Sequence, residues 1–144
     1  MFKAIKLTGT RNDPSGVWPS EIGTPGLERT NTKQLLDVGM EVYVNDDYKN
    51  NVDTYLSDAS SFEAYYVFPT EESYNTHKDL AYSILPPWKS FFESDAELES
   101  YHTMNNLVIT LEEISNPDLS GLTKLILEVV DGQVVSYTYL DPQS

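Results

Sequence analysis

The amino-acid sequence predicts an α+β fold, a single domain in which two or three helices pack on one face of a mainly antiparallel sheet of about five to six strands. Stretches with a period of two, typical of strands, occur near both ends of the chain, whereas helix patterns with cap residues are grouped between residues 70 and 101. Near the C-terminus, Asp131-Gly132 separates two β-prone segments and predicts a β-hairpin over residues 122–140. This grouping favours antiparallel neighbours over alternating βαβ units.

Length and composition predict one hydrophobic core within a single domain, residues 1–144. The chain has 144 residues, 40% of them hydrophobic, with 10 Tyr, 5 Phe and 2 Trp. Because aromatic area of this amount has to be buried or used, the chain is expected to fold despite its high charge. A domain of this length buries a sizeable core.

The N-terminal part is predicted to be one strand followed by a long loop. Residues 2–8 alternate loosely between apolar and other side chains, which favours a strand. Glycine and proline recur between residues 9 and 31 more densely than a helix or strand tolerates, so this stretch is predicted to be a surface loop. The apolar residues expected to hold the loop against the domain are Val17, Trp18, Ile22 and Leu27.

A second strand is predicted at residues 40–44, where Met40, Val42 and Val44 share one face and Asn45-Asp46-Asp47 ends the pattern. Residues 30–37, before it, fit either a single helical turn or an extended approach to the strand, and the sequence leaves both open. The polar stretch after it, residues 48–61, fits a loop or a weak helical turn, and a loop is favoured.

The clearest succession of signals is a strand followed by a helix. Residues 62–68 alternate with a period of two and predict a strand. Thr70 supplies an N-cap oxygen, and the two glutamates after it place negative charge at a helix start, so a helix is expected to begin at Glu71. Pro86 and Pro87 remove two backbone donors and end that helix at about Leu85.

Core anchors and a short helix follow the two prolines. Trp88, Phe91 and Phe92 are expected to be buried. Ser94 and Glu97 have the spacing of a capping box and predict a helix through about Tyr101, with Leu98 and Tyr101 on its inner side.

Three further strands complete the predicted sheet. The first covers residues 107–111, and the last two form the hairpin around Asp131-Gly132. A two-residue turn of type I′ pairs Val129 with Val134, Leu127 with Ser136 and Leu125 with Thr138.

Several classes of site are excluded or unsupported. The chain has no cysteine, which removes disulfides, thiolate zinc sites and cysteine nucleophiles. It has no phosphate-binding glycine loop, no dinucleotide fingerprint and no Gly-x-Ser-x-Gly elbow. Asn45-Asp46-Asp47 with Asp53 lacks the spacing of a calcium loop. No catalytic residue, metal ligand or cofactor is therefore assigned.

The start of the chain lacks a signal-peptide pattern, and no apolar run approaches the roughly 20 residues of a membrane span. A soluble cytoplasmic protein is expected. The two histidines are the side chains that titrate nearest neutral pH. His77 lies on the apolar stripe of its helix and is expected to be partly buried, and His102 is expected to interact with the helix C-terminus.

Charge is the strongest functional signal. The formal net charge is −14, and residues 61–144 hold 14 acidic and 3 basic residues, a net charge of −11. Such a field repels nucleic acid and anionic membranes, so no direct binding to either is expected, and it favours a basic protein partner. The seven acids between Ser90 and Thr123, where Lys and Arg are absent, are the candidate partner-binding residues: Glu93, Asp95, Glu97, Glu99, Glu112, Glu113 and Asp118.

An ordinary solvated surface also explains such a run of charge. The spacing of Glu93 and Glu97 favours the functional interpretation, because like charges four residues apart on a helix repel. We therefore expect a non-catalytic inhibitor, regulator or assembly accessory, which in its sharpest form imitates nucleic-acid phosphates. A small enzyme or small-molecule binder with a pocket near His77, and a structural subunit of an assembly, are the alternatives. The oligomeric state is left open.

Overall fold

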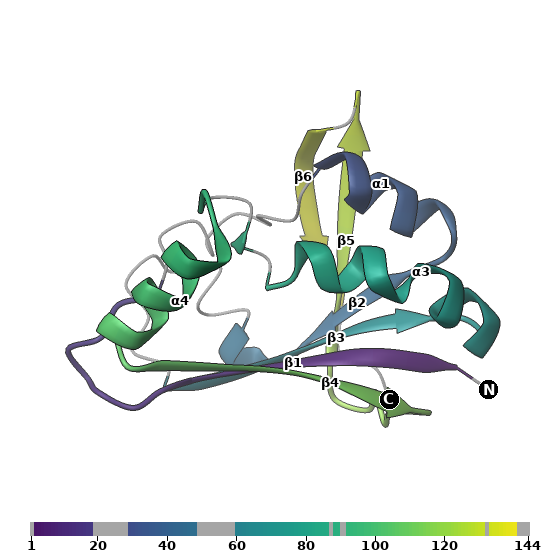
Figure 1. The fold of residues 1–144 in the computed structure, drawn as a ribbon. Helices are drawn as coiled ribbons and strands as arrows, with labels where there is room; N and C mark the ends of the chain where they lie inside the picture. Colours follow the sequence, from purple (N-terminus) through teal and green to yellow (C-terminus); the bar gives the residue numbers. More distant parts are fainter. Residues whose placement is uncertain are drawn as a thin grey trace.

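The computed structural model describes residues 2–18, 29–48, 60–86, 88–89, 92–131 and 133–140 (Figure 1). Six antiparallel strands form one sheet in the order β4-β1-β3-β2-β5-β6. The strands are β1 (Lys3–Arg11), β2 (Glu41–Val44), β3 (Ser61–Phe68), β4 (Leu107–Ser115), β5 (Thr123–Val130) and β6 (Gln133–Tyr139). This confirms the predicted α+β domain, its antiparallel sheet and its C-terminal hairpin.

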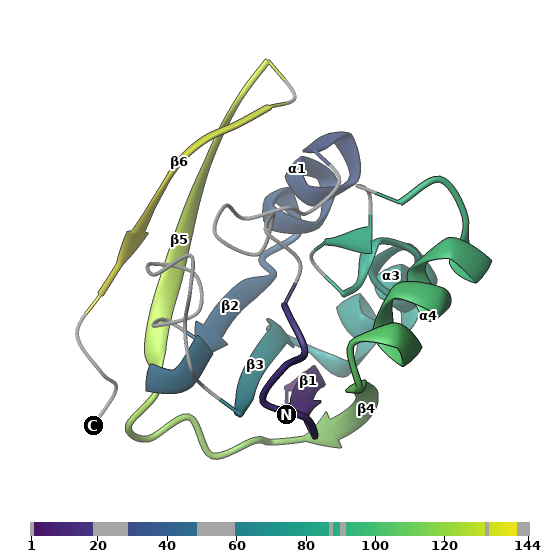
Figure 2. The ribbon, with the colours of Figure 1, turned by 90° about the vertical axis from the view of Figure 1, so that its left-hand side faces the viewer.

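Three helices lie on one face of the sheet (Figures 1 and 2): α1 (Arg29–Asp37), α3 (Glu71–Ile84) and α4 (Asp95–Met104). Helix α1 resolves the alternative left open at residues 30–37, since the segment is a helix of 9 residues. Residues 46–48, beyond β2, form a helical turn that overlaps the stretch predicted at 48–61 only at Tyr48. The remainder of the predicted loop at 48–61 lies mostly outside the described residues.

The helix ends follow their predicted caps. The Thr70 hydroxyl accepts a hydrogen bond from the Ser73 amide at 3.0 Å, and α3 begins at Glu71. Leu85, before the prolines, is extended and ends α3. The Ser94 hydroxyl accepts from the Glu97 amide at 3.1 Å. Helix α4 continues to Met104, one turn beyond its predicted end.

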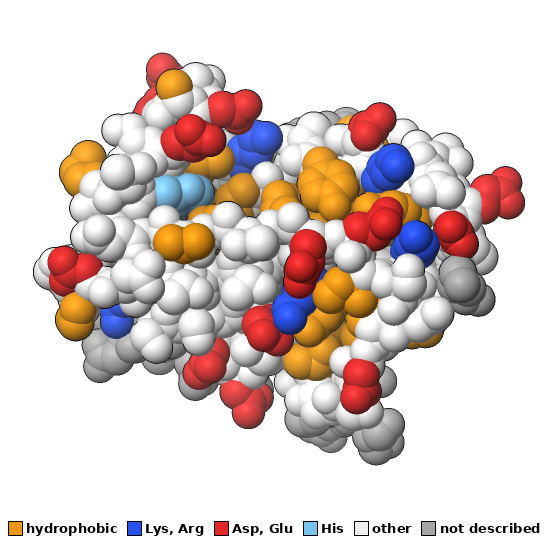
Figure 3. All heavy atoms as spheres, turned by 60° about the horizontal axis from the view of Figure 1, so that its bottom comes forward, with side chains coloured by type: hydrophobic (Ala, Val, Ile, Leu, Met, Phe, Trp, Pro, Cys, Tyr) orange, Lys and Arg blue, Asp and Glu red, His pale blue; other side chains and the backbone are white. Residues whose placement is uncertain are grey.

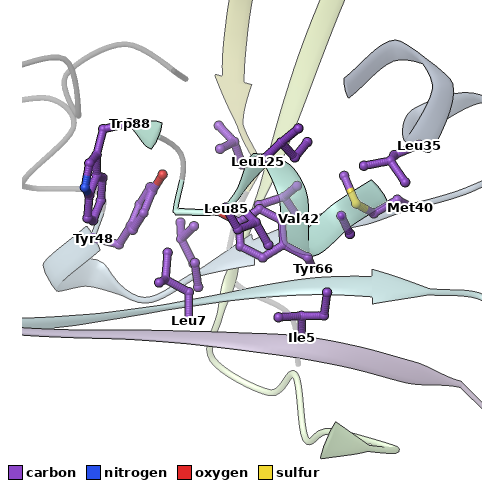
Figure 4. Packing of buried hydrophobic residues seen from close by; sticks show 14 of the residues in the cluster. Ile5, Leu7, Leu35, Met40, Val42, Tyr48, Tyr66, Leu85, Trp88 and Leu125 are labelled. Atoms are coloured by element: carbon purple, nitrogen blue, oxygen red, sulfur yellow. The ribbon is translucent and has the colours of Figure 1, made fainter. Parts of the chain in front are cut away.

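The main core fills the space between the helices and the sheet (Figure 4). Ile5 and Leu7 of β1 are fully buried and point toward Tyr66 and Leu85. Trp88 is fully buried, as predicted, and its ring lies 6.0 Å from that of Phe62. Phe92 is partly buried against the same core; Phe91 lies outside the described residues.

The range predicted for the loop, residues 9–31, was too long at both ends. Strand β1 continues to Arg11, and α1 already begins at Arg29. Gly9 suits the strand because it pairs with Phe62, whose ring takes the space of the missing side chain: a Cβ on Gly9 would lie 2.6 Å from the Phe62 Cζ. Glycine here makes room for an aromatic ring, which a count of turn-forming residues does not reveal.

Trp18 is buried, in agreement with the prediction for this segment, whereas Val17 is 56% exposed and does not anchor it. Ile22 and Leu27 lie outside the described residues. The predicted strands at 2–8 and 107–111 are present and extend to Arg11 and Ser115.

The predicted hairpin register is correct only next to the turn. Val129 pairs with Val134, but Leu127 pairs with Tyr137 and Leu125 with Tyr139, one residue beyond the predicted partners Ser136 and Thr138. The register shifts between Glu128 and Val129 of β5, because β6 bulges there by one extra residue, Val135, which has no residue opposite it. One extra residue on one strand shifts the pairing of every residue beyond it by one, which a two-residue turn alone does not predict.

Candidate functional site

Helix α4 carries three of the seven predicted partner-binding acids, a fourth, Glu93, lies just before its N-cap, and the helix is fixed firmly to the domain. Leu98 on its inner side is buried, and the Tyr101 ring lies 5.4 Å from that of Phe92. The Tyr101 hydroxyl also donates to the Val17 carbonyl at 2.9 Å. The helix therefore presents its outer side chains on a rigid support.

The four acids of this region, Glu93, Asp95, Glu97 and Glu99, are all exposed. Two of them have local structural roles, since the Glu97 carboxylate accepts from the Glu93 amide at 3.3 Å and Asp95 forms an ion pair with Lys89 at 3.5 Å. The Glu93–Glu97 spacing thus serves the helix start, which weakens the argument that like charges were placed there for a partner. The Glu93 and Glu99 carboxylates form no ion pair or hydrogen bond with any other described residue.

The other three predicted acids lie elsewhere. Glu112 and Glu113 follow each other on β4 and point to opposite faces of the sheet. Glu113 lies six residues beyond Leu107, where β4 begins after α4, so at about 3.3 Å per residue it is roughly 20 Å along the strand from the α4 end. Asp118 lies in the following loop, where its carboxylate accepts from the Ser120 amide at 3.0 Å. The structure does not bring the seven acids together into one surface.

Glu113 is part of a structural contact at the edge of the sheet. Its carboxylate lies 3.5 Å from the Lys3 ammonium and also accepts a hydrogen bond from the Tyr74 hydroxyl. The bond from Tyr74, followed by the charge of Lys3, lowers the pKa of Glu113. Hydrogen bonds from Ser120 lower the pKa of Asp118 in the same way. Both carboxylates are occupied within the domain.

Two exposed apolar residues, Met104 and Val17, accompany the acids of α4. Met104, in the last turn of the helix, is 74% exposed, and Val17 is 56% exposed. The Val17 amide donates to the Asn105 side chain at 3.1 Å, which places Val17 beside the residue that follows Met104. Sequence patterns did not point to either residue, because the helix was predicted to end before Met104 and Val17 was expected to pack against the domain.

A hydrogen bond between two aromatic side chains joins α4 to the core. The Trp88 indole N–H donates to His102 Nε2 at 3.0 Å, so that nitrogen carries no proton and the imidazole is neutral. Burial lowers the pKa of His102, and the nearby charge of Glu99 opposes this effect. His102 lies in the last turn of α4 as predicted, but there it accepts from Trp88 instead of placing a cation against the helix dipole.

His77 is half-buried on α3, as expected, and its Nδ1 lies 2.9 Å from the Ser73 carbonyl, to which it donates. This contact goes to the main chain and not to a carboxylate, which a histidine acting as a general base would use for its orientation. His77 does not line the narrow pocket between α1, α3 and the sheet. The residues that line this pocket are Leu35, Met40, Tyr66, Ala81, Ile84 and Leu85. Within the described ranges, no three His, Asp or Glu side chains gather closely enough to hold a metal ion.

The helix-free face of the sheet carries a second group of side chains that the sequence did not identify. Tyr43 and Tyr65 are opposite each other on β2 and β3, and apolar and charged side chains gather on this face (Figure 3). Lys6 forms an ion pair with Glu63 at 3.6 Å, and Lys124 forms one with Glu41. Burial, reinforced by the neighbouring glutamates, raises the pKa of both tyrosines. These two lysines and two glutamates neutralise one another, so this face is a weaker candidate than α4 for binding a charged partner.

None of the protein-family models, curated proteins and solved structures compared with this chain matches it. No helix in the part of the chain that the structure describes is long and apolar enough to cross a membrane.

Proposed function

We propose that the protein is a non-catalytic interaction protein that docks a basic protein surface through the exposed side of α4. The observation that carries this proposal is the pair of Glu93 and Glu99, two exposed carboxylates, one just before α4 and one on it, that form no ion pair or hydrogen bond with any other described residue. Lys89 is paired with Asp95, and among the residues that the structure describes no lysine or arginine forms an ion pair with Glu93 or Glu99. A basic surface supplies the missing cations.

The exposed side chains of Met104 and Val17 strengthen this choice over an ordinary solvated surface. Interfaces between proteins commonly combine an apolar patch with a charged rim, and methionine adapts readily to irregular surfaces. Here an apolar pair lies at one end of α4 and the acids lie at its start and along it. The expected partner surface is rich in Lys and Arg and has an apolar contact beside them. The role is that of an inhibitor, regulator or assembly accessory.

The test compares two double variants with the same change in charge. Glu93→Gln with Glu99→Gln removes the two free carboxylates, and Glu72→Gln with Asp79→Asn removes two exposed carboxylates from α3 as the matched control. The partner is captured from the native host lysate at low salt, and its affinity for the parent and for both variants is then measured by calorimetry at two salt concentrations.

The α4 variant should bind more weakly and with a shallower dependence on salt, because fewer ion pairs are screened. The α3 variant should bind like the parent. Equal affinity and equal salt dependence for the parent and the α4 variant would refute the proposal and show that this side of α4 is an ordinary solvated surface. Glu97 is left unchanged in this design because its loss would also disturb the start of the helix.

A further inference from the structure

The C-terminal hairpin extends beyond the part of the sheet that supports it. Only Thr123 to Leu125 of β5 pair with β2, so the rest of β5 pairs with β6 alone among the described strands. Figures 1 and 2 show the two strands continuing past β2 alongside α1. A two-stranded hairpin is only marginally stable without further packing, so an additional strand would stabilise the part of the hairpin that lies beyond β2.

Among the strands that the structure describes, β6 is the last one of the sheet and has one neighbour, β5. Its residues are Gln133-Val134-Val135-Ser136-Tyr137-Thr138-Tyr139, which include no charged residue, no proline and no glycine. Proteins normally protect such an edge with charges or proline, since its free N–H and C=O groups otherwise pair with another strand. The bulge at Val135 lies near the turn and leaves residues 136–139 in regular pairing with β5.

The opposite edge of the sheet is different. Strand β4 contains Glu112 and Glu113. If two copies of the chain paired along this edge, these carboxylates would meet a second set of carboxylates, which opposes pairing. The acidic protein therefore protects one edge against its own copies and leaves the other edge neutral.

We propose that β6 pairs antiparallel with β6 of a second copy of this chain, which forms a two-fold symmetric dimer with a continuous sheet. A two-fold axis places the strand against its own sequence, so the strand has to be compatible with itself. An uncharged strand meets this condition because it brings no like charges together. The net charge of −14 does not prevent this contact. Two domains of this size have centres at least about 30 Å apart, several times the screening length of about 8 Å at physiological salt.

The exposed apolar side chains of the hairpin are consistent with a contact at this place. Ile126 is 38% exposed, Val130 45% and Leu140 46%. All three lie on β5 or directly after β6. This inference is independent of the proposed function, and the two differ in their response to salt: docking through α4 weakens as salt rises, whereas pairing of neutral strands does not.

The test uses Thr138, which is exposed on the regular part of β6. Thr138→Lys and Thr138→Glu each place a charge on the regular part of β6, so an antiparallel pairing centred on residues 136–139 brings the like charges of the two copies close together across the two-fold axis. Sedimentation equilibrium of the parent at micromolar concentrations should give a mass near twice 16.3 kDa, at low and at high salt. Each variant alone should sediment near 16.3 kDa, and an equimolar mixture of the two should return to the dimer mass, because Lys then faces Glu.

Thr110→Lys is the matched control, an exposed threonine on the opposite edge strand, and it should remain a dimer. Circular dichroism of each variant establishes that it is folded. A parent that is monomeric throughout this range overturns the proposal, whatever other strand this edge accepts. A Thr138→Lys variant that is folded and dimeric like the parent also overturns it, as does a mixture of the two variants that stays monomeric.

Discussion

Protonation of His102 should destabilise the protein through a single buried contact. At neutral pH the imidazole Nε2 accepts the Trp88 indole N–H at 3.0 Å. The imidazolium has only donors, so protonation removes this bond and leaves the N–H of a fully buried tryptophan facing another N–H. An unsatisfied buried donor costs about 1–3 kcal/mol, and the lower end applies because His102 keeps partial contact with solvent.

The direction of the pH effect follows from the lowered pKa of His102. Since the unfolded chain binds the proton more readily, the contribution to stability is complete above the unfolded pKa of about 6.5. It is lost as the pH falls from there through the lower pKa of the folded state, by at most about 1.4 kcal/mol per pH unit. Below that pKa this group causes no further loss. The pKa values of Glu113 and Asp118 are also lowered, but those carboxylates lose their contributions only below about pH 4.

Urea unfolding followed by tryptophan fluorescence measures this effect between pH 7.5 and pH 5. His102→Gln provides an amide oxygen that accepts from the indole but does not titrate, so its free energy of unfolding should change less than that of the parent across this window. His77→Gln is the matched control and should keep the pH dependence of the parent, because the contact between Trp88 and His102 is intact. If the parent and His102→Gln lost the same free energy between pH 7 and pH 5.5, the hydrogen bond would not be the cause.

Three substitutions test the packing, each by its free energy of unfolding in urea. Gly9→Ala should lose about 1–3 kcal/mol, because its Cβ would lie 2.6 Å from the buried Phe62 ring, and a stability equal to the parent would mean that the ring moves freely. Trp88→Ala should lose about 3–5 kcal/mol, as truncation of a fully buried aromatic residue does, and a loss below about 1 kcal/mol would contradict its role as an anchor. Gly132→Val should lose about 1 kcal/mol or more, because a type I′ turn requires a positive φ at this position and a β-branched residue resists it. Asp131, the residue before it, already has the positive φ of 52° that is typical of this turn. An unchanged unfolding midpoint would indicate another turn type.

The features that the sequence determined by itself are those decided between close neighbours in the chain. Thr70 caps α3 because its hydroxyl reaches an amide three residues away, and Ser94 caps α4 in the same manner. Pro86 ends α3 through the steric restriction on the residue before it. Asp131-Gly132 connects β5 and β6 because this pair suits the backbone of a two-residue turn. These effects act over a few bonds, so the sequence is sufficient to predict them.

Other features depend on which segments meet in space. Gly9 belongs to a strand because Phe62, from a distant segment, takes the space above it. Glu112 and Glu113 are separated from the acids of α4 because β4 leads away from that helix and turns alternate residues to opposite faces. Trp18 is buried and Val17 is exposed because only Trp18 reaches Phe62, at 4.8 Å between ring centroids. In each case the deciding contact joins residues far apart in the chain, and tertiary packing selects that contact from many that the local sequence permits.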